Sequence, residues 1–109
     1  MSADGEQVLL VLSNLPDQAA AQKLARLLVE LRLAACVNVL APCASVYRWR
    51  GAVEETTEVP VLIKTTARRY AELEAAVRAH HPYELPEIVA VPLAGGLPDY
   101  LDWVAGETA

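Results

Sequence analysis

The chain has 109 residues, of which 54% are hydrophobic, and a formal net charge of −5 at pH 7. A chain of this length forms one domain with its own core, and no apolar run approaches the roughly 18 residues that a membrane span needs. The basic residues are scattered along the chain, which argues against binding to a nucleic-acid backbone. We therefore expect a single soluble, cytoplasmic domain over residues 1–109, without nucleic-acid or membrane partners, in which residues 1–6 are flexible.

The first elements in chain order are a strand and a helix. Residues 7–14 form a short apolar run that is typical of a buried strand. Asp17 is suited to cap the helix that follows, because its carboxylate can accept first-turn N–H groups. The helical spacing continues to about residue 33, and four leucines share one face: Leu24, Leu27, Leu28 and Leu31.

A long hairpin comes next. Strand character extends over residues 34–50, and Pro42 predicts a bulge or bend within it. Gly51 can take the positive φ of a tight turn, after which the chain returns as a strand over 53–66. Pro60 lies in this return strand and has no N–H to donate, so its nitrogen should face a gap or an edge.

The last third of the chain predicts a helix, a strand and a short helix. Residues 67–81 have helical spacing that ends before Pro82, and residues 86–93 read as a strand. Pro98 suits the first turn of the closing helix. The residues expected to face inward are Tyr70, Leu73 and Val77 in the first helix and Tyr100, Trp103 and Val104 in the second.

The element order is therefore β-α-β-β-α-β with a C-terminal helix, which is the ferredoxin-like α+β plan. Each hairpin arm could span on the order of 50 Å at about 3.3 Å per residue. A domain of this size has a diameter of roughly 34 Å. The hairpin should protrude, and its exposed strand edges would invite pairing. We expect a homo-oligomer for this reason.

The stretch AHHPYELPE, residues 79–87, holds both histidines of the chain. His80 and His81 have Glu84 and Glu87 within chain reach, and imidazole is a ligand for copper, zinc and nickel. The same stretch also suits the end of a helix, because histidine is favoured at a helix C-terminus and Pro82 stops the helix. Both interpretations, a metal site and helix termination with subunit packing, stay open.

Side chains of the long hairpin could either form a ligand site or serve packing alone. Tyr47 and Trp49 share one face of the hairpin, which fits subunit packing or a ligand platform. Lys64 lies in an apolar strand, where it should point outward or meet a carboxylate such as Glu54, Glu55 or Glu87. A Lys–Glu pair in a cleft between subunits would be a candidate anion or ligand site.

No enzyme pattern is visible in the sequence. There is no glycine-rich phosphate loop, GxSxG or HExxH, and no nucleophile–base pair can be recognised. The two cysteines, Cys36 and Cys43, match no standard zinc spacing and are expected to be free thiols. We therefore expect a protein that is not an enzyme.

Five segments of the sequence resemble, in order, the signature segments of the CutA family of divalent-cation tolerance proteins. They are LRLAACVNVL (31–40), SVYRWRG (45–51), EVPVLIKTT (58–66), HPYELPEIVAVPL (81–93) and GGLPDYLDWV (95–104). The resemblance implies a ferredoxin-like subunit, a homotrimer packed through the hairpin, and a cytoplasmic role in tolerance of copper and other divalent cations, with no obligatory cofactor.

The resemblance also implies two kinds of site. Copper ligation in the family is assigned to a cysteine at the end of the first strand and to the histidine pair, which map here onto Ser13, His80 and His81, with Glu84 as a further candidate. A serine hydroxyl is a poor copper ligand. The alternative follows from the likeness of the family's trimer to PII signalling proteins: small-molecule or anion sensing in inter-subunit clefts, here by Tyr47, Trp49, Lys64, Tyr83 and Glu87.

Overall fold

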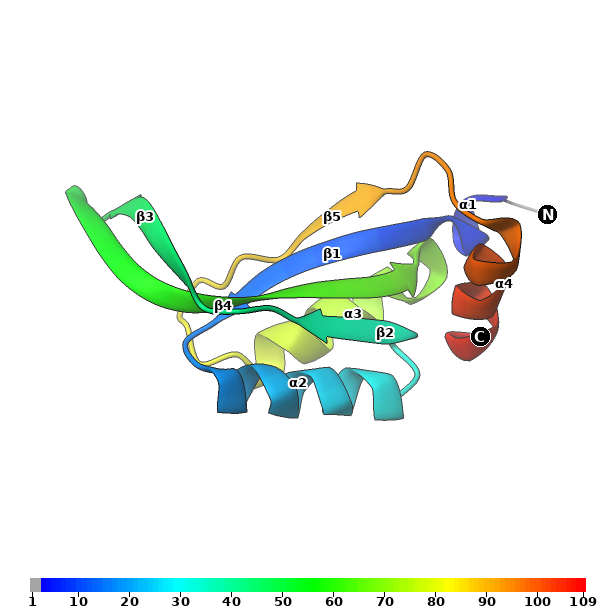
Figure 1. The fold of residues 1–109 in the computed structure, drawn as a ribbon, viewed down its shortest axis with the longest axis horizontal. Coiled ribbons are helices and arrows are strands. Elements are labelled where there is room, and N and C mark those ends of the chain that lie inside the picture. Colours follow the sequence, from blue (N-terminus) through cyan, green and yellow to red (C-terminus); the bar gives the residue numbers. More distant parts are fainter. Residues whose placement is uncertain (1–2) are drawn as a thin grey trace.

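The computed structural model describes residues 3–109 and has the predicted order of elements (Figure 1). Ala3–Glu6 form a single helical turn, and residues 1–2 lie outside the described residues, so the flexibility expected of 1–6 stays a prediction. The elements are α1 (Ala3–Glu6), β1 (Val8–Leu15), α2 (Gln18–Glu30), β2 (Cys36–Val39), β3 (Cys43–Trp49), β4 (Ala52–Thr66), α3 (Ala67–His80), β5 (Val89–Pro92) and α4 (Pro98–Glu107).

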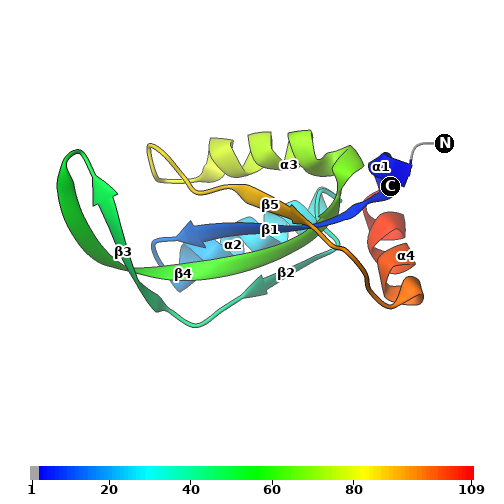
Figure 2. The same cartoon turned by 90° about the horizontal axis from the view of Figure 1, so that it is seen from above.

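The sheet has the ferredoxin-like strand order β2-β4-β1-β5, with every pair antiparallel and β3 continuing along β4 beyond β2. Both long helices, α2 and α3, cover the same side of the sheet (Figures 1 and 2). The core lies between these two helices and the sheet. Alternate residues of each strand point into it, because side chains alternate between the two faces of a sheet. Its fully buried side chains include Val11, Leu15, Leu28, Ile63 and Leu73.

Helix α2 begins as predicted but ends earlier. The carboxylate of Asp17 accepts the N–H of Ala20 at 2.8 Å, as an N-cap should. The helix stops at Glu30 because Arg32 adopts a left-handed φ of 61°, which no helix can continue through. Leu31 therefore lies beyond the helix and is exposed, so the prediction that it shares a helix face with Leu24, Leu27 and Leu28 is wrong.

The hairpin contains the predicted break and turn. Strand β2 ends at Val39 and β3 begins at Cys43, on either side of Pro42. The carbonyl of Pro60 accepts the N–H of Leu40 at 3.0 Å, so the proline nitrogen, on the same side of its strand, faces this break. Arg50 and Gly51 have φ of 50° and 83°, the signs that a type I′ turn demands.

The hairpin projects from the body, as predicted. The chain measures 47 × 25 × 23 Å along its principal axes, and the hairpin tip and α4 occupy opposite ends of the longest one (Figures 1 and 2). The hairpin curves toward the side of the sheet that carries no helix (Figure 1).

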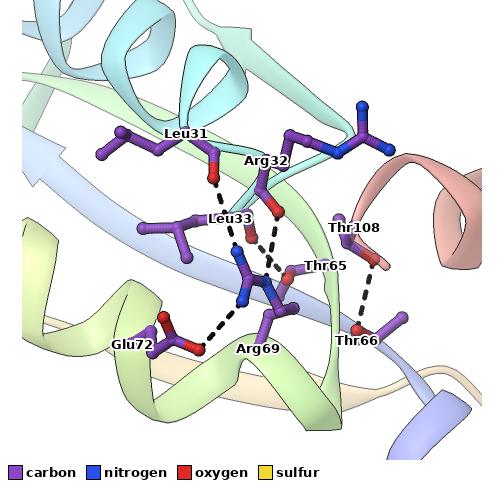
Figure 3. A network of polar contacts seen from close by, with 8 residues as sticks. All are labelled: Leu31, Arg32, Leu33, Thr65, Thr66, Arg69, Glu72 and Thr108. Carbon is purple, nitrogen blue, oxygen red and sulfur yellow. Dashed lines mark hydrogen bonds and ion pairs between the residues drawn. The ribbon is translucent and has the colours of Figure 1, made fainter.

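Polar contacts hold the end of the body near α4 (Figure 3). Arg69 of α3 donates to the carbonyls of Leu31 and Arg32, which follow α2, and pairs with Glu72 at 2.9 Å. A cation is favoured there because helix C-termini carry unpaired carbonyls. These contacts fix α2 and α3 to one another at the end of the molecule away from the hairpin.

Helix α4 differs from the prediction. Val104 is fully buried as expected, against Val8 and Ala35. Tyr100 and Trp103 were predicted to face inward but are 39% and 44% exposed. Only one narrow face of this short helix, the one that carries Val104, packs on the body. Tyr100 and Trp103 lie beside that face, and their rings pack on each other with centroids 5.5 Å apart.

The side of the sheet away from α2 and α3 carries an apolar patch beside Lys64 and Asn38. Register pairs Leu10 with Val91 and Leu12 with Val89, so these side chains share one face, which Leu62 of β4 extends. We call these five residues the open sheet face. Val89 and Val91 are each 48% exposed. Within residues 3–109 no helix is long and apolar enough to span a membrane.

Ser13 is an anomaly in the core. It is 1% exposed on the helix side of β1, and its hydroxyl has no hydrogen-bond partner among the described residues. Thr65, equally buried, donates to the carbonyl of Leu33 at 2.6 Å. A buried polar group without a partner costs about 1–3 kcal/mol.

Ser13→Ala should therefore raise the free energy of unfolding by about 1 kcal/mol, because it removes a hydroxyl that forms no bond. Thr65→Val is the matched control and should lower it by about 1 kcal/mol, because the bond to Leu33 is lost. Denaturant unfolding at one protein concentration measures both values. A Ser13→Ala variant less stable than wild type would show that the hydroxyl has a partner.

Candidate functional site

A cavity of about 440 Å³ lies along one face of the hairpin, from Glu58 near its base to Arg50 in its turn. One wall is the hairpin face that carries Tyr47, Trp49 and Glu58. The opposite wall is the connection between α3 and β5, which extends toward the hairpin (Figure 2). The full lining is Asn14, Tyr47, Trp49, Arg50, Glu58, Pro82, Tyr83, Glu84, Leu85 and Glu87.

His81 positions the α3–β5 connection. It is 8% exposed and follows the last residue of α3, where Pro82 prevents the helix from continuing. Its Nε2 lies 2.7 Å from the carbonyl of Asn14, and its Nδ1 accepts the N–H of Tyr83 at 3.1 Å. The imidazole also packs on the Tyr83 ring, with centroids 4.8 Å apart. His81 thereby ties the end of α3 to the end of β1.

Tyr83 and Glu58 join the two walls. The Tyr83 hydroxyl lies beside the Glu58 carboxylate and can donate a hydrogen bond to it. Burial, followed by this hydrogen bond and the negative charge of Glu58, raises the pKa of Tyr83 to about 12. The phenol therefore stays protonated at neutral pH and acts as a donor.

The remaining polar groups pair across the cavity mouth. Arg50 donates to both oxygens of Glu84 at 2.9 Å and lies 5.0 Å from the centroid of the Trp49 ring. Asn14 donates to Glu87 at 2.8 Å. The hairpin turn is thus connected to the α3–β5 segment, and β1 is connected to the segment's far end.

The structure brings together four of the five predicted cleft residues, Tyr47, Trp49, Tyr83 and Glu87. Lys64 lies elsewhere, and its ammonium contacts the side-chain oxygen of Asn38 on β2. The expected pair between Lys64 and a carboxylate is not formed within residues 3–109, because Asn38 lies closer across the strand pair.

Sequence reasoning missed Arg50, Asn14 and Glu58. A signal for Glu58 existed in the hairpin register. A two-residue turn at 50–51 pairs Tyr47 with Glu54 and Cys43 with Glu58, so Glu58 shares the face of Tyr47.

The predicted metal contacts do not converge. His80 is exposed, with Nδ1 at 2.9 Å from the carbonyl of Ala76, whereas both nitrogens of His81 are engaged by backbone groups. Ser13 faces the core, and Glu84 is paired with Arg50. Within residues 3–109 no three His, Cys, Asp or Glu side chains are placed to hold an ion. The copper ligand set implied by the resemblance does not fit this arrangement.

The two cysteines are free thiols, as predicted. Cys36 pairs in register with Lys64 and Cys43 with Glu58, so six residues of β4 separate them. They therefore form neither a disulfide nor a common thiolate site.

The chain is thus a ferredoxin-like domain with a projecting hairpin and a partly aromatic cavity along that hairpin. Residues 9–107 match the family model described as CutA1 divalent ion tolerance protein. The chain belongs to this family.

Individual relatives agree. The divalent-cation tolerance protein CutA of Thermus thermophilus is 46% identical over 91% of this chain and 96% of its own length. The chain spans 59% of the longer CutA homolog of Xenopus laevis, at 46% identity over 82% of this chain. The crystal structure of CutA from Xylella fastidiosa superposes with a TM-score of 0.92 at 44% identity, covering 94% of this chain and 99% of that one. A structure described as the periplasmic divalent cation tolerance protein CutA from Archaeoglobus fulgidus has a TM-score of 0.90 at 34% identity, covering 94% and 99%.

The raised pKa of Tyr83 predicts a loss of stability in alkali. The folded-state pKa of Tyr83, about 12, exceeds the ordinary value of 10.0. The contribution of the protonated phenol to the free energy of unfolding is therefore complete below pH 10 and is lost as the pH rises toward 12. The difference in tyrosinate absorbance between wild type and Tyr83→Phe should show one group titrating near 12, which separates Tyr83 from Tyr70 and Tyr100, whose pKa values burial also raises. Glu58→Gln should lower the pKa of Tyr83 but leave it above 10.0, since burial persists. An unchanged curve in Glu58→Gln would contradict the hydrogen bond.

Proposed function

We propose that the chain forms a homotrimer that serves divalent-cation tolerance by binding a small ligand and responding to it, without catalysis. The observation that carries this proposal is the cavity along the hairpin, which gathers Tyr47, Trp49, Tyr83 and Glu87 from two separate parts of the sequence. Three aromatic rings with a few convergent polar groups are typical of ligand pockets. The lining contains no serine, cysteine, histidine or lysine, and the raised pKa of Tyr83 keeps its phenol protonated at neutral pH, which supports binding without catalysis.

The open sheet face supports the trimer. Two layers of secondary structure bury only one side of this sheet, and an apolar second side is stable when another surface covers it. The hairpin adds exposed Val46 and Val53 on its face away from the cavity. A closed ring of identical chains would cover these surfaces without leaving strand edges free.

We also propose a cytoplasmic location. Two free cysteines in one short chain fit a reducing compartment. A signalling role comparable to that of PII proteins would follow from ligand binding beside a subunit interface.

Native mass spectrometry tests the trimer and the ligand together. We expect a species at three times the chain mass of 11.8 kDa, with an additional mass when the protein is isolated gently from its host. Val89→Glu together with Val91→Glu should dissociate the species, because charges would replace apolar side chains on the open sheet face. Val29→Glu, an exposed valine on α2, is the control and should leave the trimer intact. A monomeric wild type without added mass would refute the proposal.

A second candidate is direct binding of copper or another divalent cation at His80. The observation that favours it is the exposure of this imidazole, of which only Nδ1 has a backbone partner among the described residues. A single imidazole from each chain gives weaker binding than a preformed set of three ligands. His81 would contribute structure rather than a metal bond, since its nitrogens are already engaged.

Calorimetric titration with Cu²⁺ and Zn²⁺ in metal-free buffer separates the two histidines. His80→Ala should abolish any heat of binding and change the free energy of unfolding by less than about 0.5 kcal/mol. His81→Ala should retain the binding but lose about 2 kcal/mol of stability, because the Asn14 carbonyl and the Tyr83 N–H lose their partner. Binding that survives in His80→Ala and disappears in a folded His81→Ala would reverse these roles.

A further inference from the structure

Glu58 is a buried carboxylate without a cationic partner. It is only 8% exposed, yet it lines the cavity. Within residues 3–109 no lysine, arginine or histidine pairs with it within 4.0 Å. Its partner is the neutral hydroxyl of Tyr83. A buried carboxylate is normally paired with a positive charge, because its desolvation is otherwise uncompensated. Glu58 therefore lacks the partner that its burial calls for.

The other charges of the cavity cannot supply this partner. Arg50 is the single cation in the lining, and both of its hydrogen bonds go to Glu84, while its guanidinium lies over the Trp49 ring. Glu87 is bonded by the neutral amide of Asn14. Lys64, the cation that was predicted to belong to this site, instead contacts Asn38 outside the cavity. With three carboxylates and one guanidinium the lining carries an excess of negative charge, which disfavours an anionic ligand.

The aromatic walls distinguish between kinds of cation. Tyr47 and Trp49 come from the hairpin and Tyr83 from the opposite wall, so rings bound the cavity on both sides of Glu58. Aromatic faces attract weakly hydrated organic cations such as ammonium and guanidinium groups. A bare divalent metal ion instead needs several oxygen or nitrogen ligands converging on one point, and the described residues contain no such set of three.

We propose that this cavity binds a small organic cation, an ammonium or guanidinium group on a short apolar chain, with Glu58 as its counter-ion and Tyr47, Trp49 and Tyr83 as its walls. This inference rests on the proposed function and replaces its anion option with a cation. The Tyr83 hydroxyl beside Glu58 can take one lone pair of the carboxylate as a donor, which leaves the remaining lone pairs for the ligand.

Fluorescence of Trp49 provides the test. The chain has two tryptophans, so Trp103→Phe leaves Trp49 as the reporter inside the cavity. The oligomer in this background is titrated with n-butylammonium, and with 1-pentanol, butyrate, Mg²⁺ and Cu²⁺ at matched ionic strength. We expect saturable quenching by n-butylammonium and none by the other probes. Glu58→Gln, which preserves size and the acceptor for Tyr83, should weaken n-butylammonium binding by about tenfold or more.

Glu55→Gln is the matched control. It removes the same charge from the same strand, but Glu55 lies on the opposite face of the hairpin, outside the cavity. Its affinity for n-butylammonium should equal that of the parent. Equal weakening by both substitutions would reduce the effect to general electrostatics and overturn the assignment of Glu58.

The remaining outcomes separate this inference from the proposed function. Saturable binding of butyrate, pentanol or a metal ion in place of the ammonium would overturn the cation class but keep the cavity as a ligand site. If no probe binds and Glu58→Gln weakens the oligomer, the counter-ion is a basic side chain of a second copy, and the inference fails. If no probe binds, and gently isolated protein is a monomer without added mass, both proposals fail.

Discussion

The long strand β4 is the element on which the rest of the structure depends. Its 15 residues pair with β1, β2 and β3, so that both the body and the hairpin use the same strand. From Val59 onward its alternate side chains enter the core, and before that point the strand is paired with β3 alone along the hairpin. Glu58 lies where the hairpin part of β4 meets the part that belongs to the body. The cavity occurs there because the strand leaves the body at this point and bends toward the helix-free side.

The cavity also depends on a histidine that looks like a metal ligand and acts as a structural connector. His81 uses its donor on the Asn14 carbonyl and its acceptor on the Tyr83 N–H. The bond to the Tyr83 N–H orients Tyr83 toward Glu58. The bond to the Asn14 carbonyl holds the residue whose side chain donates to Glu87. One neutral imidazole therefore fixes both ends of the cavity wall. The family's association with divalent cations does not require this side chain to bind one.

Much of the fold could be predicted from local patterns, because Pro42, Gly51, Asp17 and the helical spacing of leucines act on their own neighbours in sequence. The failures concern interactions between distant segments. His81 meets a carbonyl 67 residues away, and no local pattern announces that its nitrogens are engaged. Lys64 meets Asn38 through a strand register that depends on where β2 begins. Tyr100 and Trp103 were misplaced because helical periodicity shows which residues share a stripe but not how wide the receiving surface is. Whether the site residues bind a metal or another ligand stays a prediction.

The break between β2 and β3 makes the hairpin an arm that can turn about its base. Around residues 40–42 one side of β4 has no strand pairing, so the base of the arm joins the body through β4 and its pairing with β1, and the tip joins it through the Arg50–Glu84 pair. The arm formed by the seven residues of β3 is about 23 Å long at 3.3 Å per residue. A rotation of about 5° at its base would displace the tip by about 2 Å on this length. The Arg50–Glu84 pair ties this tip to the opposite wall of the cavity, so a ligand that separates the pair would free the tip to move by this amount.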